Sequence, residues 1–184
     1  MSNTPITYIH QPLIEAAKKE DRNAQSKLYT LYYKAIYNSS LRIVGDRFSA
    51  EDIMQDSFID GFKNIHQFDA RSTFGAWIKK IAINKSINFI KRQQLLTHKL
   101  DDYSNAEEVD QEEESETHSI EEVKMAMNKL APNYKVVFSL YMIEGYDHDE
   151  IAKIMDISSS TSRSQLSRAK KQVKRLIQNQ HKMA

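Results

Sequence analysis

The sequence contains no cysteine, and glycine and proline account for only four and three of its 184 residues. Without cysteine, the chain forms neither disulfides nor thiolate metal sites. No run of apolar residues approaches the length that spans a membrane, and the opening MSNTPITYIH lacks the basic start and apolar stretch of a secretory signal. We therefore expect a cytoplasmic protein that is not inserted into a membrane.

Patterns typical of enzymes are also absent. The six histidines are scattered without metal-ligand spacing, and the four glycines form no phosphate-binding loop. His148 stands at the cap of a short predicted helix and is interpreted as a surface residue. The carboxylates that follow residue 100 lack the turn geometry and interposed glycine of a calcium loop. We expect no enzymatic activity, no bound metal and no cofactor.

The scarcity of glycine and proline, together with abundant Lys, Glu, Gln, Ala, Leu and Met, predicts an all-α fold. Residues 101–116 carry many carboxylates, no basic side chain and few apolar ones, so they cannot bury enough surface to offset the cost of ordering. A structureless loop of this length is unusual inside one compact domain. We predict two small helical domains, residues 1–95 and 119–184, joined by an acidic flexible linker over residues 96–118.

The formal net charge of +1 conceals a strong segregation of charge along the chain. Residues 70–100 and 157–184 contain basic but no acidic side chains, and they lie on either side of the acidic segment. A single block of this kind is ordinarily a solvated helix face. Two such blocks around an acidic segment favour two polyanion-binding modules joined by an anionic connection.

Helical periodicity predicts three helices in the first domain, over residues 13–43, about 49–66 and about 74–94. Gly45 and Asp46 supply the turn after the first helix, and Ser49, with a carboxylate three residues on, supplies the N-cap of the second. The apolar stripe of the third helix consists of Phe74, Trp77, Ile78, Ile81, Ala82 and Ile90. We expect Trp77 to be a core residue that holds this helix to its neighbours.

The second domain has the layout of a helix-turn-helix. Its helices are predicted over residues 119–130, from Pro132 onward, over 151–155 and from 159 to about 178. The expected buried face of the second helix consists of Tyr134, Val137, Phe138 and Tyr141. A three-residue turn, Asp156 to Ser158, precedes the basic last helix. Asp156 stands where a turn glycine is usual, and aspartate tolerates the left-handed conformation better than most residues.

In a helix-turn-helix the second helix enters the major groove by its N-terminal residues. The side chains expected to face DNA are therefore Ser160, Thr161, Ser162, Arg163, Ser164 and Gln165. Two of them, Arg163 and Gln165, are able to make bidentate base contacts. The side chains expected against the phosphate backbone are Arg168, Lys170, Lys171 and Lys174. Ser162 stands where a packed valine is common. The alternative is a purely structural basic C-terminal helix.

The third helix of the first domain places amides and basic groups away from its apolar stripe. The side chains off the stripe are Lys80, Asn84, Lys85, Asn88, Lys91 and Arg92, and this face resembles a groove for single-stranded nucleic acid or duplex backbone. The preceding loop combines an amide, an aromatic ring and a guanidinium, which together are able to stack and to hydrogen-bond, so we expect it to accept a flipped base. The three loop residues are Gln67, Phe68 and Arg71.

Two stretches of the sequence are similar to a known family. The run AEDIMQDSFIDGFKNIHQFD followed by STFGAWIKKIAINKSINFIKR resembles the second region of extracytoplasmic-function sigma factors, and LAPNYKVVFSLYMIEGYDHDEIAKIMDISSSTSRSQLSRAKKQVKR resembles their fourth region. The resemblance covers nearly the whole chain outside the linker and the two ends, with both motifs in the family's order and spacing. Asn88 departs from the pattern, because many members have an aspartate there.

The resemblance implies a sigma factor that binds bacterial core RNA polymerase and directs promoter-specific strand opening and transcription initiation. It implies that one helix of this chain docks on the clamp coiled coil of the β′ subunit, through Asp52, Ile53, Gln55, Asp56 and Phe58. It assigns the melted −10 promoter element to residues 64–73 and to the polar face of the following helix. The recognition helix would read the −35 element as duplex, and the second domain would rest on the β flap.

The resemblance further implies that the acidic linker threads towards the RNA exit channel and that an anti-sigma factor binds the chain. Two alternatives stay open from the sequence. An ordinary helix-turn-helix regulator accounts for the second domain but leaves the carboxylate-bearing helix and the acidic linker without a role. A protein–protein adaptor built from helical domains is the other alternative.

Overall fold

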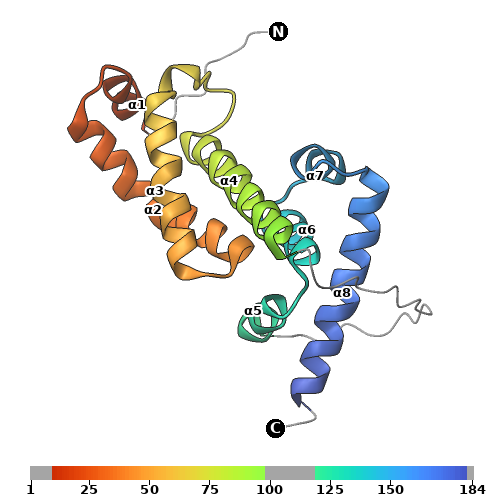
Figure 1. Ribbon diagram of the computed structural model, residues 1–184. Helices are drawn as coiled ribbons and strands as arrows, with labels where there is room; N and C mark the ends of the chain where they lie inside the picture. Colours follow the sequence, from red (N-terminus) through yellow and green to blue (C-terminus); the bar gives the residue numbers. More distant parts are fainter. Residues whose placement is uncertain (1–9, 98–118, 182–184) are drawn as a thin grey trace. The chain divides into compact units, whose positions relative to one another are not determined.

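The computed structural model describes residues 10–97 and 119–181, and every regular element within them is a helix (Figure 1). In chain order the elements are α1 (Gln11–Lys18), α2 (Arg22–Val44), α3 (Arg47–Lys63), the 3-10 turn η1 (Ile65–Gln67), α4 (Phe74–Thr97), α5 (Ile120–Asn128), α6 (Pro132–Met142), α7 (His148–Met155) and α8 (Ser159–His181). The all-α prediction is confirmed. None of the described helices is long and apolar enough to span a membrane.

The chain divides into two compact units, residues 1–88 and 89–184, and the division falls within α4. The predicted boundary at residue 95 also lies in this helix, which continues to Thr97. Most of the predicted linker lies outside the described residues. The domain boundaries therefore stay a prediction.

The expected single helix over residues 13–43 is wrong, because the chain breaks into α1 and α2 around Glu20. Glu20 has a left-handed backbone with φ 63°, which a right-handed helix cannot accommodate. Asp21 then starts α2, and its carboxylate accepts hydrogen bonds from the backbone N–H groups of Asn23 (2.8 Å) and Ala24 (3.1 Å). No glycine or proline marks this break in the sequence.

The N-cap of α3 is Asp46 and not Ser49. The Asp46 carboxylate accepts from both the backbone N–H (2.8 Å) and the hydroxyl (2.7 Å) of Ser49, and these bonds lower the pKa of Asp46 below its ordinary value. Gly45, with φ 80°, ends α2 immediately before it, as predicted. The helix also ends earlier than expected, at Lys63, and η1 follows.

Aromatic rings fill much of the core of the first unit. Phe58, Phe68 and Phe74 are all buried, and Phe74 lies 5.9 Å from the Phe68 ring in an edge-on arrangement. Trp77 is partly buried, and its ring centroid lies 5.6 Å from that of Phe68 and 5.8 Å from that of Phe74, so it packs against this core and holds α4 to it. Helices α2 and α3 lie side by side (Figure 1), and the rest of this core comes from them together with α1, η1 and α4.

The second unit is organised around α8, which contacts α5, α6 and α7 (Figure 1). Its buried side chains recur every three or four residues and are Ser162, Leu166, Ala169, Val173 and Ile177. In α6, Val137 and Phe138 are buried as expected, but Tyr134 is half-buried and the Tyr141 side chain is 37% exposed. The expected buried face of α6 is therefore correct in its centre only.

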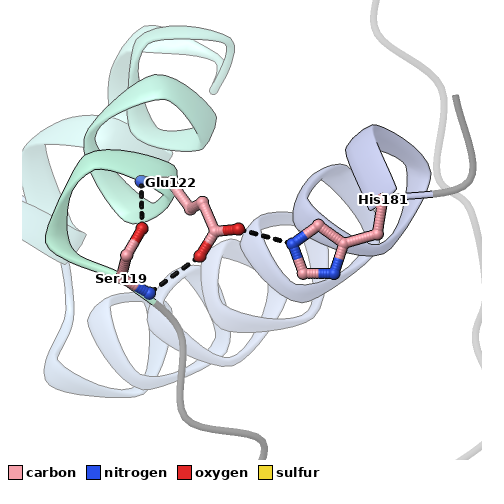
Figure 2. A network of polar contacts seen from close by, with 3 residues as sticks. All are labelled: Ser119, Glu122 and His181. Atoms are coloured by element: carbon pink, nitrogen blue, oxygen red, sulfur yellow. Dashed lines mark hydrogen bonds and ion pairs between the residues drawn. The ribbon is translucent and has the colours of Figure 1, made fainter. Parts of the chain in front are cut away.

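A polar network joins the start of α5 to the end of α8 (Figure 2). The hydroxyl of Ser119 accepts from the Glu122 backbone N–H (3.2 Å), and the Glu122 carboxylate accepts from the Ser119 backbone N–H (2.7 Å), which completes a capping box. The other carboxylate oxygen of Glu122 meets Nε2 of His181 at 2.5 Å. The predicted Ser119 cap is thus confirmed.

We expect the contribution of this network to depend on pH. The His181 contact and the Ser119 bonds lower the pKa of Glu122 from 4.5 to about 2. The ionised carboxylate therefore stabilises the fold fully above pH 4.5, and this stabilisation is lost as the pH falls towards 2. Glu122→Gln should lower the thermal midpoint at pH 7, and the gap to wild type should close across that range. Glu121→Gln, in the same first turn, is the matched control and should show no such trend.

The turn between α7 and α8 has the geometry anticipated from the sequence. Asp156 caps α7 with φ 61° and ψ 50°, in the left-handed region, and its N–H donates to the carbonyl of Ala152. The residues between α7 and α8 are Asp156, Ile157 and Ser158, so the predicted three-residue turn is confirmed. The helix-turn-helix therefore forms without the usual glycine.

Replacing this aspartate by glycine should stabilise the protein, because glycine adopts the left-handed region without steric cost. We expect Asp156→Gly to raise the free energy of unfolding by about 0.5–1 kcal/mol and Asp156→Val to lower it by more than about 1 kcal/mol, as urea unfolding would measure. Glu20→Gly, at the other break with φ 63°, should show the same sign. Destabilisation by Asp156→Gly would mean that the aspartate side chain contributes more than its strain costs.

Candidate nucleic-acid interface

The polar face predicted on α4 exists as a row of exposed side chains, namely Lys80, Asn84, Asn88, Lys91 and Arg92. Spacings of three and four residues put them on one side of the helix. The opposite side is fixed by burial of the apolar side chains, to which Ile83 and Ile87 belong in addition to most of the predicted stripe. Burial of one face thus presents amides and cations on the other.

One base of the same acid-free block has a different role. Lys85 on α4 pairs with Asp60 on α3 at 2.7 Å between Nζ and Oδ2, and the hydrogen bond from Lys85 lowers the pKa of Asp60. Both side chains are partly buried. This ion pair ties the two helices together, so Lys85 does not contribute to the exposed polar face.

The loop before α4 presents only two of its three predicted residues. Gln67 and Arg71 are exposed, and Arg71 lies 3.1 Å from the carboxylate of Asp69. Phe68 is only 3% exposed and lies among the core rings, so the expectation that it stacks on a flipped base is wrong for this structure. The aromatic core offers Phe68 more apolar contact than solvent does, and an aromatic residue in a polar loop gives no sequence signal for that choice.

A truncation distinguishes these two roles of Phe68. Phe68→Ala should lower the free energy of unfolding by about 3–5 kcal/mol, because it removes a buried ring and leaves a cavity. Arg71→Ala, three residues on and exposed, is the comparison and should change it by less than about 0.5 kcal/mol. Urea unfolding of the two variants measures both values, and a small effect of Phe68→Ala would return the ring to the candidate interface.

The carboxylate-bearing helix α3 has an exposed acidic side formed by Asp52, Gln55 and Asp56. Two residues that were expected to share it are core residues instead, because Ile53 is 7% and Phe58 2% exposed. Exposed and buried residues alternate in pairs along this part of α3, as expected for a helix with one packed side, and Ile53 and Phe58 fall on the packed side. Ile53 and Phe58 therefore hold α3 in place, and the three polar residues remain as the candidate contact surface.

An open groove beside this acidic side was not anticipated. Its walls come from α2 and α3, and its lining residues are Arg22, Gln25, Ser26, Tyr29, Gln55, Phe58, Ile59 and Phe62. Ile59 is 50% exposed, three residues beyond Asp56. The sequence signal for this groove is Ile59 itself, which follows Asp52 and Asp56 at helical spacing. An isoleucine on the exposed polar side of a helix is not explained by burial and indicates a contact surface.

The first turns of α8 present most of the residues predicted to face DNA. Ser160, Arg163, Ser164, Arg168 and Lys171 are exposed, whereas Thr161 and Gln165 are half-buried. Ser158 caps this end, because its hydroxyl accepts from the backbone N–H of Thr161 at 3.0 Å. Oε1 of Gln165 is buried and has no hydrogen-bond partner in the described part of the chain.

Ser162 does not belong to this exposed set, so its expected contact with DNA is wrong. The residue is 0% exposed and points to the inner side of α8. Its hydroxyl lies 2.9 Å from Nδ1 of His148, the first residue of α7. His148 was expected on the surface, but it is partly buried, and its ring stacks on Tyr141 at 4.6 Å between centroids.

The candidate interfaces contain no metal centre in the residues that the structure covers, because no three His, Asp or Glu side chains there gather as ligands. What the arrangement offers is recognition by charge and hydrogen bonding. The α4 and α8 faces carry guanidinium, ammonium, amide and hydroxyl groups suited to phosphate and base edges. The α3 face carries carboxylates, which suit a basic partner.

Family comparison agrees with the two-part organisation. Residues 28–96 match the family described as Sigma-70 region 2, and residues 120–173 match the family described as Sigma-70, region 4. The first match contains α3, most of α2 and nearly all of α4, and the second contains α5, α6, α7 and the first two-thirds of α8. Each candidate face lies inside one of these two regions.

Similar proteins are sigma factors along most of their length. The ECF RNA polymerase sigma-E factor of Haemophilus influenzae is 27% identical over 91% of this chain and 95% of its own, and the ECF sigma factor SigM of Bacillus subtilis is 27% identical over 82% and 93%. Among solved structures, the sigma factor RpoE of Bartonella quintana, in complex with the anti-sigma factor NepR, shares the fold with a TM-score of 0.57, 18% identity and coverage of 83% and 96%. CnrH, in complex with the cytosolic domain of CnrY, gives a TM-score of 0.55 at 18% identity over 91% and 96%.

Proposed function

Because the chain belongs to the extracytoplasmic-function sigma factors of bacterial RNA polymerase, we propose that it binds core polymerase and directs promoter-specific initiation. One observation carries this proposal in the structure. The chain combines an acidic helix face on α3 with two acid-free polar faces, on α4 and at the start of α8. An ordinary helix-turn-helix regulator needs only the last of these.

The α3 face is the proposed polymerase contact. Asp52 and Asp56 are one helical turn apart and exposed, and Gln55 lies between them. Ile59, on the rim of the groove, adds apolar surface to this polar row. A basic helix of the β′ clamp coiled coil would meet carboxylates at the centre of this patch, where charge complementarity raises the rate of association and fixes orientation.

The α4 face and the loop before it are the proposed −10 contact. Strand opening requires unstacked bases to be captured, and amides such as Asn84 and Asn88 are able to hydrogen-bond base edges, while the neighbouring cations hold phosphates. Gln67 and Arg71 extend this surface into the loop. Since Phe68 is part of the core, base capture in this proposal uses polar groups and not that ring.

The start of α8 is the proposed −35 contact. Arg163 is exposed in the second turn, where a recognition helix meets the major groove, and its guanidinium suits guanine O6 and N7. Arg168 and Lys171 lie farther along the helix and would contact phosphates, which gives the complex its salt dependence. Gln165 would contact a base once its side chain turns outward, because its amide oxygen is now buried without a hydrogen-bond partner in the described part of the chain.

Two further partners belong to the proposal. The acidic segment 101–116 would follow the path of nucleic acid towards the RNA exit channel, since its carboxylates resemble phosphates in charge. An anti-sigma factor would bind the free chain, because RpoE and CnrH, which share its fold, were solved with proteins bound to them. The second unit would rest on the β flap when polymerase is bound.

Two charge reversals test the proposal in one experiment. Asp52→Arg should weaken co-migration of the protein with sigma-free core polymerase on a sizing column by about tenfold in affinity, since it replaces an attractive charge by a repulsive one. Arg163→Glu should leave co-migration unchanged and abolish promoter-directed transcription. Each variant is thus the control for the other.

A third reversal, Glu15→Arg on α1, checks that charge alone is not responsible. Glu15 is exposed, pairs with Lys18 at 3.4 Å and accepts a hydrogen bond from Gln11 at 2.9 Å, which are surface contacts of little energy. Its reversal should leave both co-migration and transcription intact. Failure of the wild-type protein to associate with core polymerase at low salt would contradict the proposal and leave a stand-alone DNA-binding regulator as the better account.

A further inference from the structure

The two helices of the helix-turn-helix are joined by polar contacts at their N-terminal turns. Nδ1 of His148 and the hydroxyl of Ser162 are 2.9 Å apart, and the hydroxyl of Ser159 donates to Oδ1 of Asp149 at 2.5 Å. His148 and Asp149 are adjacent in the first turn of α7, and Ser159 and Ser162 are three apart in the first turn of α8. Two bonds between the same two turns restrict both the tilt and the rotation of α8.

The Ser162 hydroxyl bonds to a neighbouring helix, whereas two other buried serines, Ser57 and Ser86, bond within their own helices. The hydroxyl of Ser57 donates to the carbonyl of Ile53 (2.5 Å), and that of Ser86 donates to the carbonyl of Ala82 (2.8 Å), so both remain within their own helix. Ser162 is equally buried but reaches across to α7. The Ser162 hydroxyl therefore connects two helices, whereas the hydroxyls of Ser57 and Ser86 bond to carbonyls of their own helices.

The imidazole that receives this contact is itself held in place. Its ring stacks on the Tyr141 ring at 4.6 Å between centroids, with 25° between the planes. Nζ of Lys170 lies 5.8 Å from the centroid of the same Tyr141 ring. Asp147 caps α7 directly before His148 through bonds to the N–H groups of Asp149 and Glu150. His148 is thus fixed by α6 and by the cap before it meets α8.

We propose that His148 is a positioning residue for −35 recognition, which sets the rotation of α8 through the Ser162 hydroxyl while touching no DNA itself. Successive positions on a helix differ by about 100°, so turning Ser162 inward directs Arg163 and Ser164 outward. An apolar side chain at residue 162 would pack without fixing this angle, whereas a hydrogen bond is directional. The inference rests on the proposed function, since it concerns how the proposed −35 face is aimed.

Two isosteric amides test it, because the amide of asparagine occupies the place of Nδ1 in a histidine ring and that of glutamine the place of Nε2. Core polymerase is loaded with each variant and transcribes a library of duplex promoters that is randomised at both the −35 and the −10 positions. The enrichment of particular −35 and −10 sequences among the transcribed promoters is then measured. His148→Asn should retain −35 enrichment within about twofold, and His148→Gln should lose about tenfold, as expected for one directional bond. The −10 enrichment, which depends on α4 and the loop before it, should be unchanged in both.

Ser162→Ala provides a second variant that removes a single oxygen from the buried site and leaves its packing in place. It should match His148→Gln in −35 enrichment, and the double variant should be no worse than either, because both remove the same bond. Equal −35 enrichment by the Asn and Gln variants, or wild-type enrichment by Ser162→Ala, would overturn the positioning role alone. A wild-type holoenzyme that enriches no −35 sequence would overturn the proposed function and this inference together.

Discussion

Burial of one apolar face on each long helix is the constraint on which the rest of the structure depends. In α4 that face includes Phe74, Ile78 and Ala82, and in α8 it includes Leu166 and Val173. Each fully buried aliphatic or aromatic side chain is worth about 1.5–3 kcal/mol, whereas a single polar contact contributes about 1 kcal/mol. Rotating either helix by one residue would expose several apolar side chains at once. The side of each helix that faces outward follows from this burial.

Polar contacts then determine where helices begin and how neighbouring helices are aligned. The carboxylates of Asp21 and Asp46 start α2 and α3 by accepting backbone N–H groups, and Glu122 fastens α5 to the end of α8. The Lys85–Asp60 pair joins α3 to α4 within the first unit. These bonds are local and directional, so they refine a packing that apolar burial has already selected.

The three exposed faces differ in charge, and this difference separates their proposed partners. Asp52 and Asp56 on α3 favour a basic protein surface, and the acid-free faces of α4 and α8 favour nucleic acid. Membership of the sigma factor family gives these chemistries a common purpose, since such a protein must hold polymerase and promoter DNA at the same time. The proposed role of His148 adds a residue that lies on none of these faces and acts on DNA recognition through its bond to Ser162.

The sequence by itself determined the all-α class, the helix-turn-helix with its three-residue turn at Asp156, the Ser119 cap and the outward row from Lys80 to Arg92. These features depend on periodicity and local hydrogen bonding, which neighbouring residues specify. Only the tertiary structure decided that Phe68, Ile53, Phe58 and Ser162 are buried, that α1 and α2 are separate, and that His148 bonds across to α8. A side chain at the edge of a stripe faces inward or outward according to which helix packs beside it, and that neighbour comes from a distant part of the chain.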